Sequence, residues 1–277
     1  MTDSAMGFTG GLRARCERIW AGLHGHPFLA ELADGTLPLE KFRFFIEQDL
    51  MFLPEFARCM ALGAAKSRGE EELEFFNRQL DGIVRLEIAS NRRLLEQVIG
   101  LGAADRGGSA AMAPANLAYT SFLLATAAAG GPAEITAAIL PCSWSYVAIA
   151  RGLGDIASHP VYSDWVGFYL QDTEADLVTD MRATLDEMAA EKGARDRERL
   201  AEIFAMSSRL EGMFWEMAYT LDQWPDLRGH SAGGAGAGVL PPLVRLNDLS
   251  FRRGGASAPG ARRARLRRWR PGRPGRR

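Results

Sequence analysis

An apolar side chain recurs every three or four residues along most of the first 228 residues, and this repeat limits the folds open to the chain. Phe45, Phe52 and Phe56 fall on one helix face, because an α-helix turns once in 3.6 residues. The repeat predicts helices over residues 45–56, 73–95, 117–128, 132–149, 161–188 and 197–221. Alternating apolar and polar residues, which would predict strands, are missing. We therefore predict an all-α fold, a compact helical bundle.

The composition changes after residue 228 and predicts two unequal parts. Residues 229–238 (GHSAGGAGAG) have the composition of a flexible linker. Beyond Asp248 there are 11 arginines and no acid, whereas the preceding residues carry 22 basic and 34 acidic side chains. We predict a helical domain over residues 1–228, followed by a linker and a disordered basic tail over residues 229–277. Arginine clusters bind phosphates, but few aromatic side chains interrupt this one, so we expect no nucleic-acid partner.

The sequence predicts a cytoplasmic protein. Residues 1–11 contain an acid and lack the basic and apolar stretches of a secretory signal. No apolar run approaches the roughly 20 residues of a membrane helix, so we expect no membrane partner. Cys16, Cys59 and Cys142 are too widely spaced for a CxxC pair or a metal knuckle, and fit free thiols.

Two acids occupy positions where the helical repeat would place apolar residues. Asp49 lies on the face of Phe45 and Phe52, and Glu211 lies on a stripe with Trp215. A carboxylate is rarely buried in such a stripe unless it has a partner or a task. Both acids are therefore candidate site residues, although an acid at the edge of its stripe would simply reach water or pair with an arginine.

Cys142 follows a proline inside an otherwise helical segment. Pro141 lacks the N–H that closes a helical turn, so it kinks a helix and frees a carbonyl group one turn earlier. Such a kink opens space for a ligand beside the thiol, and Tyr146 shares the helix face of Cys142. A buried structural cysteine in a kinked core helix is the alternative.

Histidines are too isolated to predict a metal centre. His26 and His159 each precede a proline, as residues at helix starts do. No histidine belongs to a Glu-x-x-His pair of the kind that binds iron in bundle cores. We therefore predict no metal and no other cofactor.

Several short strings, taken together and in order, resemble the thiaminase II (TenA) family of the haem-oxygenase-like helical fold. They are residues 26–28 (HPF) with 34–38 (DGTLP), 44–53 (FFIEQDLMFL), 118–120 (AYT), 137–146 (AAILPCSWSY), 159–162 (HPVY) with 165–169 (WVGFY), and 207–219 (SSRLEGMFWEMAY). The likeness spans residues 20–224. It implies a haem-oxygenase-like bundle and a homotetramer.

The resemblance also implies roles for individual residues. Cys142 matches the family's catalytic cysteine, and Glu211 matches its acid–base glutamate. The substrate-binding residues would be Asp49, Phe52, Tyr119, Tyr146 and Tyr169, with Asp49 on the amino edge of the pyrimidine. Phe52 stands where many members have a tyrosine, which removes one hydrogen bond but leaves ring stacking intact.

The implied activity is that of an aminopyrimidine aminohydrolase. Such an enzyme releases 4-amino-5-hydroxymethyl-2-methylpyrimidine from thiamin or its breakdown products, in thiamin salvage. The residues suit this substrate, because aromatic rings can sandwich a flat pyrimidine while a carboxylate accepts from its amine. One alternative is a non-catalytic pyrimidine- or thiamin-binding or regulatory protein, which Phe52 favours. Another is a metal- or oxygen-dependent enzyme of the same fold, which the scarcity of histidines opposes.

Overall fold

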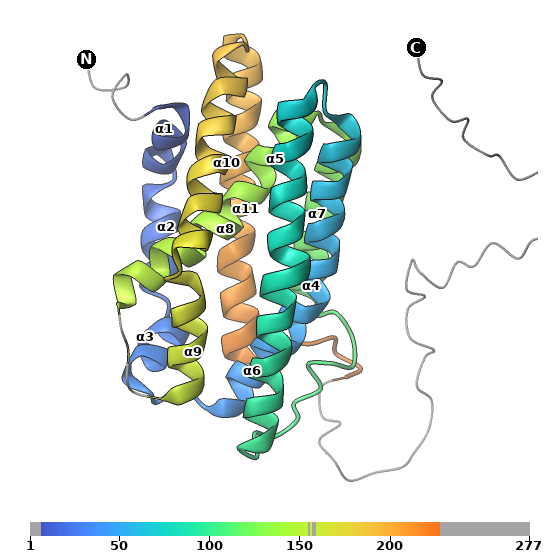
Figure 1. The fold of residues 1–277 in the computed structure, drawn as a ribbon. Coiled ribbons are helices and arrows are strands. Elements are labelled where there is room, and N and C mark those ends of the chain that lie inside the picture. The colour runs from blue at the N-terminus through green and yellow to red at the C-terminus, as the bar shows by residue number, and fades with distance from the viewer. Residues whose placement is uncertain (1–6, 155, 157–158, 228–277) are drawn as a thin grey trace, which may run out of the picture. The chain divides into compact units, whose positions relative to one another are not determined.

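The computed structural model describes residues 7–154, 156 and 159–227, and this part of the chain contains helices and no strand (Figure 1). The elements are α1 (Gly7–Arg15), α2 (Glu17–His24), α3 (Pro27–Asp34), α4 (Leu39–Lys66), α5 (Glu70–Asp81), the π-helical turn η1 (Gly82–Glu87), α6 (Ile88–Gly100), α7 (Pro114–Ala129), α8 (Pro132–Leu153), α9 (Pro160–Tyr169), α10 (Asp172–Ala190) and α11 (Ala194–Thr220). The predicted all-α fold is confirmed. The predicted disordered tail, residues 229–277, lies outside the described residues.

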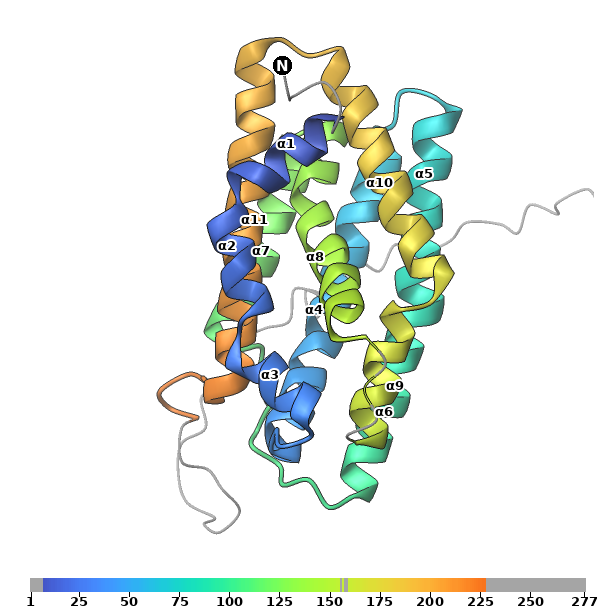
Figure 2. The same ribbon diagram turned by 90° about the vertical axis from the view of Figure 1, so that its left-hand side faces the viewer.

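Helix α8 runs through the middle of the bundle and packs against α4, α10 and α11 (Figure 2). Aromatic side chains fill the space beside it. Phe45 of α4 stacks on Trp215 of α11 with ring centres 5.1 Å apart, and Trp165 of α9 meets Phe45 edge-on at 5.9 Å. All three side chains are fully buried. Such ring pairs add about 0.5–1.5 kcal/mol each beyond their area burial, so they hold α4, α9 and α11 together.

By length and composition, α8 is apolar enough to cross a membrane, which differs from the expectation that no segment approaches this limit. However, 72% of its most apolar 18-residue window is buried inside the bundle. Its apolar character therefore reflects its place in the core. The helix also continues through Pro141, as α4 continues through Pro54.

The predicted helix over residues 73–95 is not continuous. A π-helical turn, η1, separates α5 from α6. A π turn inserts an extra residue into a helix and is often found at functional sites. The extra residue turns the residues that follow it to a different side of the helix. Glu87, at the end of this turn, lines the pocket described below.

The contact between α4 and α5 depends on a glycine. A Cβ atom added at Gly63 would overlap the ring of Phe76, which is fully buried. We expect Gly63→Ala to lower the free energy of unfolding by about 1–3 kcal/mol, despite the better helix propensity of alanine. Gly22→Ala is the matched control, because an added Cβ in α2 meets no atom within 4 Å. Urea unfolding measures both, and a Gly63→Ala protein as stable as the unaltered one would refute this close packing.

Candidate active site

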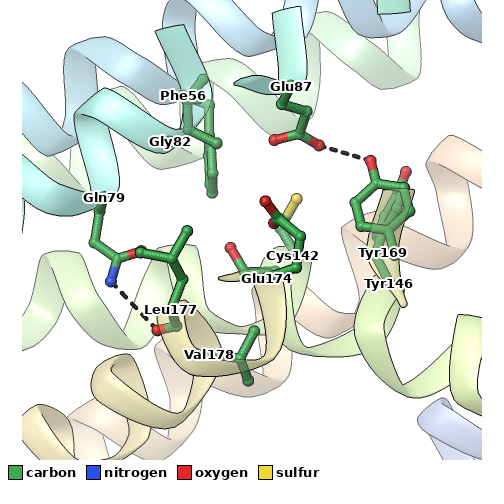
Figure 3. A pocket seen from close by; sticks show the side chains of 12 residues that line it. Phe56, Gln79, Gly82, Glu87, Cys142, Tyr146, Tyr169, Glu174, Leu177 and Val178 are labelled. Carbon is green, nitrogen blue, oxygen red and sulfur yellow. Dashed lines mark hydrogen bonds between the residues drawn. The ribbon is translucent and has the colours of Figure 1, made fainter. Parts of the chain in front are cut away.

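A small pocket opens beside the middle of α8 (Figure 3). Three of the predicted site residues line it: Cys142, Tyr146 and Tyr169. The other lining residues are Phe56, Gln79, Gly82, Ile83, Glu87, Ser143, Glu174, Leu177 and Val178. The pocket thus combines a thiol, aromatic rings and two carboxylates, contributed by α4, α5, η1, α8, α9 and α10.

A chain of polar groups leads from the thiol into the core. The Cys142 thiol donates to the Glu211 carboxylate. The Tyr119 hydroxyl donates to Glu211 Oε1 over 2.6 Å and lies 2.9 Å from the Ser207 hydroxyl, which donates to the Ala138 carbonyl oxygen over 2.6 Å. Glu211 is only 1% exposed. The acid is therefore buried with hydrogen-bond partners, which excludes the alternative of an acid at the edge of its stripe that reaches water.

Burial alters the acidity of both members of the Cys142–Glu211 pair. It raises the pKa of Glu211 to about 7, although hydrogen bonds from Tyr119 and Cys142 oppose the rise. Burial, followed by the negative charge of Glu211, raises the pKa of the Cys142 thiol well above its usual range. Near neutral pH the thiol therefore keeps its proton, and the carboxylate beside it is balanced between its two states. This arrangement suits a proton transfer from sulfur to Glu211 during a reaction.

Asp49 is 4% exposed, and its Oδ2 atom accepts a 2.6 Å hydrogen bond from Asn91 of α6. Burial, followed by the charge of Glu87, raises the pKa of Asp49 well above its usual range. Its charge also raises the pKa values of Cys142 and Tyr146, so Asp49 lies near both side chains. Four of the predicted site residues do not line the open pocket: Asp49, Phe52, Tyr119 and Glu211.

The predicted aromatic residues form two groups of touching rings. Tyr146 lies between Tyr169, with ring centres 5.1 Å apart, and Trp215, on which it stacks at 5.2 Å. In the other group, the Phe52 ring is 5.0 Å from the ring of Tyr119. Phe52 has no hydroxyl, so it contributes ring contact and no hydrogen bond.

Three polar residues near the site were not predicted from the sequence: Glu87, Asn91 and Glu174. Glu87 accepts a 2.6 Å hydrogen bond from the Tyr169 hydroxyl, and burial raises its pKa to about 7. Burial and then the charge of Glu87 raise the pKa of Glu174 to about 7 as well. Glu87 is the last residue of the π turn, and Asn91 follows it in α6. Because the turn changes the helical phase, a search at a spacing of 3.6 residues does not place these two residues on the apolar face. Glu174 lies in the first turn of α10, where acids are common for electrostatic reasons alone.

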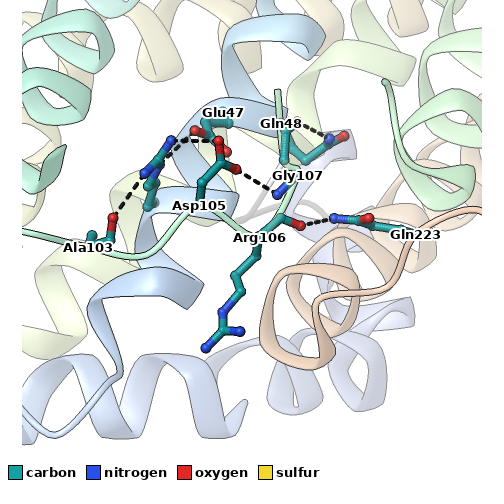
Figure 4. Close-up of polar contacts among 9 residues, drawn as sticks. Glu47, Gln48, Ala103, Asp105, Arg106, Gly107 and Gln223 are labelled. Carbon is teal, nitrogen blue, oxygen red and sulfur yellow. Dashed lines mark hydrogen bonds and ion pairs between the residues drawn. The ribbon is translucent and has the colours of Figure 1, made fainter. Parts of the chain in front are cut away.

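The part of α4 that carries Asp49 is fastened to the loop between α6 and α7 (Figure 4). Gln48 donates to the Gly108 carbonyl oxygen over 2.6 Å and accepts from the Ala113 backbone N–H over 2.9 Å. Asn116 of α7 donates to the Gln48 carbonyl oxygen over 2.8 Å. These bonds to Gln48 fix α4 next to α7.

The predicted helix starts at the histidines are confirmed, since α3 begins at Pro27 and α9 at Pro160. The His26 ring accepts from the backbone N–H of Phe28. Within the described residues, no three His, Cys, Asp or Glu side chains are placed to hold a metal ion. The independence from metal stays a prediction.

Comparison with known proteins agrees with the helical site. Residues 13–221 match the TENA/THI-4/PQQC family. The aminopyrimidine aminohydrolase of Halalkalibacterium halodurans is 34% identical over 79% of this chain and 98% of its own, and that of Bacillus subtilis is 31% identical over 80% and 93%. The TenA homologue protein from P. horikoshii OT3 superposes with a TM-score of 0.68 at 32% identity, covering 77% of this chain and 99% of its own. The family predicted from the sequence motifs is confirmed: this chain belongs to the TENA/THI-4/PQQC family.

Proposed function

We propose that the protein is an aminopyrimidine hydrolase of the thiaminase II type. It would release 4-amino-5-hydroxymethyl-2-methylpyrimidine from thiamin or its breakdown products, in thiamin salvage. The observation that carries this proposal is the hydrogen-bonded Cys142–Glu211 pair, whose thiol lines the pocket together with Tyr146 and Tyr169. The relatives that are 34% and 31% identical are aminopyrimidine aminohydrolases, which supports a hydrolase.

The proposed reaction begins when the Cys142 thiol passes its proton to Glu211 and its sulfur bonds to a ring carbon of the pyrimidine. Glu211 then gives that proton to a ring nitrogen, which removes the charge that would build up there. The electron pair returns from the ring as the bond between the exocyclic methylene and its amine breaks. The amine leaves as a neutral molecule, water adds to the methylene carbon, and the surplus proton of that water passes to the released amine. The carbon–sulfur bond then breaks, and the proton on the ring nitrogen returns to the sulfur. The net change replaces an amine by a hydroxyl group.

A binding or regulatory protein of the same fold is the second candidate. Phe52 favours it, because the pocket lacks a hydroxyl at this position, and a TenA family transcription regulator from Silicibacter sp. TM1040 superposes with a TM-score of 0.69 at 28% identity. The retained Cys142–Glu211 pair opposes it. Incubation with thiamin and with 4-amino-5-aminomethyl-2-methylpyrimidine, followed by chromatography, separates the candidates. An enzyme forms the hydroxymethyl product catalytically, and a regulator leaves both compounds unchanged.

Asp49 is proposed to hold the amino edge of the pyrimidine. Asn91 occupies its Oδ2 atom, which leaves Oδ1 to accept from the substrate amine. Replacing Asp49 by asparagine would place a side-chain N–H, which is a hydrogen-bond donor, opposite the substrate amine, which is also a donor. We expect the affinity for the hydroxymethyl product to fall by about 1.5–3 kcal/mol in calorimetry. Unchanged affinity, with helical circular dichroism intact, would remove Asp49 from the binding site.

We also propose that the helical domain ends near residue 228, as the sequence predicts. The last described helix, α11, ends at Thr220, and the family match ends at residue 221. A chain ending at Arg228 should therefore fold and keep its turnover. Thermal unfolding and a turnover assay against the full chain test this, and aggregation or loss of most activity on truncation would contradict it.

The homotetramer and the cytoplasmic location stay predictions. An apolar surface on α7 and α11 supports self-association, because Phe122, Ile203 and Leu210 line a shallow hollow there. Met206, in the same hollow, is 43% exposed. Apolar patches of this kind often mark protein–protein contacts.

A further inference from the structure

The pocket carries two carboxylates that the proposed reaction does not use. Glu87 projects from η1 and Glu174 from α10, and both line the pocket that also contains the Cys142 thiol (Figure 3). Among the described residues that line the pocket, no lysine or arginine balances them. When ionised, these acids therefore place negative charge beside the thiol, with no basic side chain to offset it.

The two acids differ in their bonding. Glu87 already accepts from the Tyr169 hydroxyl. Within the described part of the chain, the Glu174 side chain has no hydrogen-bond or ion-pair partner, although it is removed from water enough for burial to raise its pKa to about 7. An acid in this setting gains from a cation brought into the pocket, because the cation replaces lost solvation and offsets the repulsion from Glu87.

We propose that Glu174, together with Glu87, binds the positively charged leaving group of the substrate and so selects cationic substrates. The proposal rests on the proposed function. The pyrimidine ring would lie against Cys142, Tyr146 and Tyr169, and its methylene substituent would point to the two carboxylates. A primary ammonium group or a thiazolium ring carries the required charge.

The product of the reaction lacks that charge, since a neutral hydroxyl group replaces the amine. Glu174 should therefore strengthen substrate binding and have little effect on product binding. Because Glu174 does not hold the neutral pyrimidine product, this carboxylate should not slow its release. It also separates a role in charge recognition from a role in folding or in pocket shape.

Calorimetry on proteins that already carry Cys142→Ser tests the proposal without turnover. The probes are 4-amino-5-aminomethyl-2-methylpyrimidine, which is cationic, and its neutral hydroxymethyl analogue. We expect Glu174→Gln to weaken binding of the cation about tenfold and to change binding of the neutral compound less than about twofold. Glu174→Asp keeps the charge and should retain part of the preference.

Asp176→Asn is the matched control, because it removes the same charge from an exposed position two residues further along α10. It should leave both affinities unchanged. Equal weakening of both compounds by Glu174→Gln, or no weakening of either, would overturn the inference while leaving the hydrolase intact. If the unaltered protein neither binds nor converts the two pyrimidines, the proposed function fails first, and the inference fails with it.

Discussion

Replacing Cys142 by serine should reduce the single-turnover rate on an aminopyrimidine by at least about 10³-fold, with ligand affinity nearly unchanged. Serine keeps the shape of the side chain, but a hydroxyl group is a far poorer nucleophile than a thiol. Its hydrogen bond to Glu211 can persist, so the pocket should remain intact. Rapid-quench measurement of product and calorimetry of binding give the two quantities separately.

Cys16 and Cys59 provide the controls. Both are buried in the apolar core, and burial raises the pKa of Cys59 to about 12, so this thiol is inert near neutral pH. Alanine at either position should leave the chemical step unchanged, even where it lowers stability. Full turnover in Cys142→Ser would rule out catalysis by the thiol.

Glutamine in place of Glu211 should lower the rate by roughly 10²–10⁴-fold and remove a pH dependence. In the unaltered protein the ionised carboxylate accepts the thiol proton, and its pKa is about 7. The rate should therefore be highest above this pKa and fall as the pH drops through about 7, because protonated Glu211 cannot accept. Glutamine keeps the size of the side chain and cannot transfer a proton, so the residual rate should lose this fall.

Glu174→Gln is the comparison for the pH profile, because the pKa of Glu174 is also raised to about 7. If Glu211 is the base, the fall in single-turnover rate at saturating substrate persists without Glu174. If the fall in rate disappears in Glu174→Gln and survives in Glu211→Gln, the titrating group is Glu174, and Glu211 is not the base.

The helices could be predicted because local rules and the fold agree. Pro132 opens α8 and His26 precedes α3, as the sequence indicates. The acids on apolar faces could be identified in the same way, since Asp49 and Glu211 interrupt a regular stripe and are both buried. The assignment of Cys142 needed the family resemblance, because a cysteine in a core helix has no distinctive pattern.

The rest of the site depends on contacts between helices that sequence spacing does not contain. The π turn changes the phase of the chain before Asn91, so its hydrogen bond to Asp49 joins residues 42 apart in the sequence. Tyr169 and Glu87 are 82 apart, and Tyr119 and Glu211 are 92 apart. Such pairs become visible only when the packing of the bundle is known.

The central claim is that Cys142 and Glu211 act as one unit, and the double variant tests it most directly. If sulfur attack and proton transfer depend on each other, either substitution alone removes most of the rate and the second adds little. The measurement is the single-turnover rate of Cys142→Ser, Glu211→Gln and the protein carrying both. We expect the double variant to lie within about threefold of the slower single variant. A double variant whose loss equals the product of the two single losses would contradict the coupled mechanism.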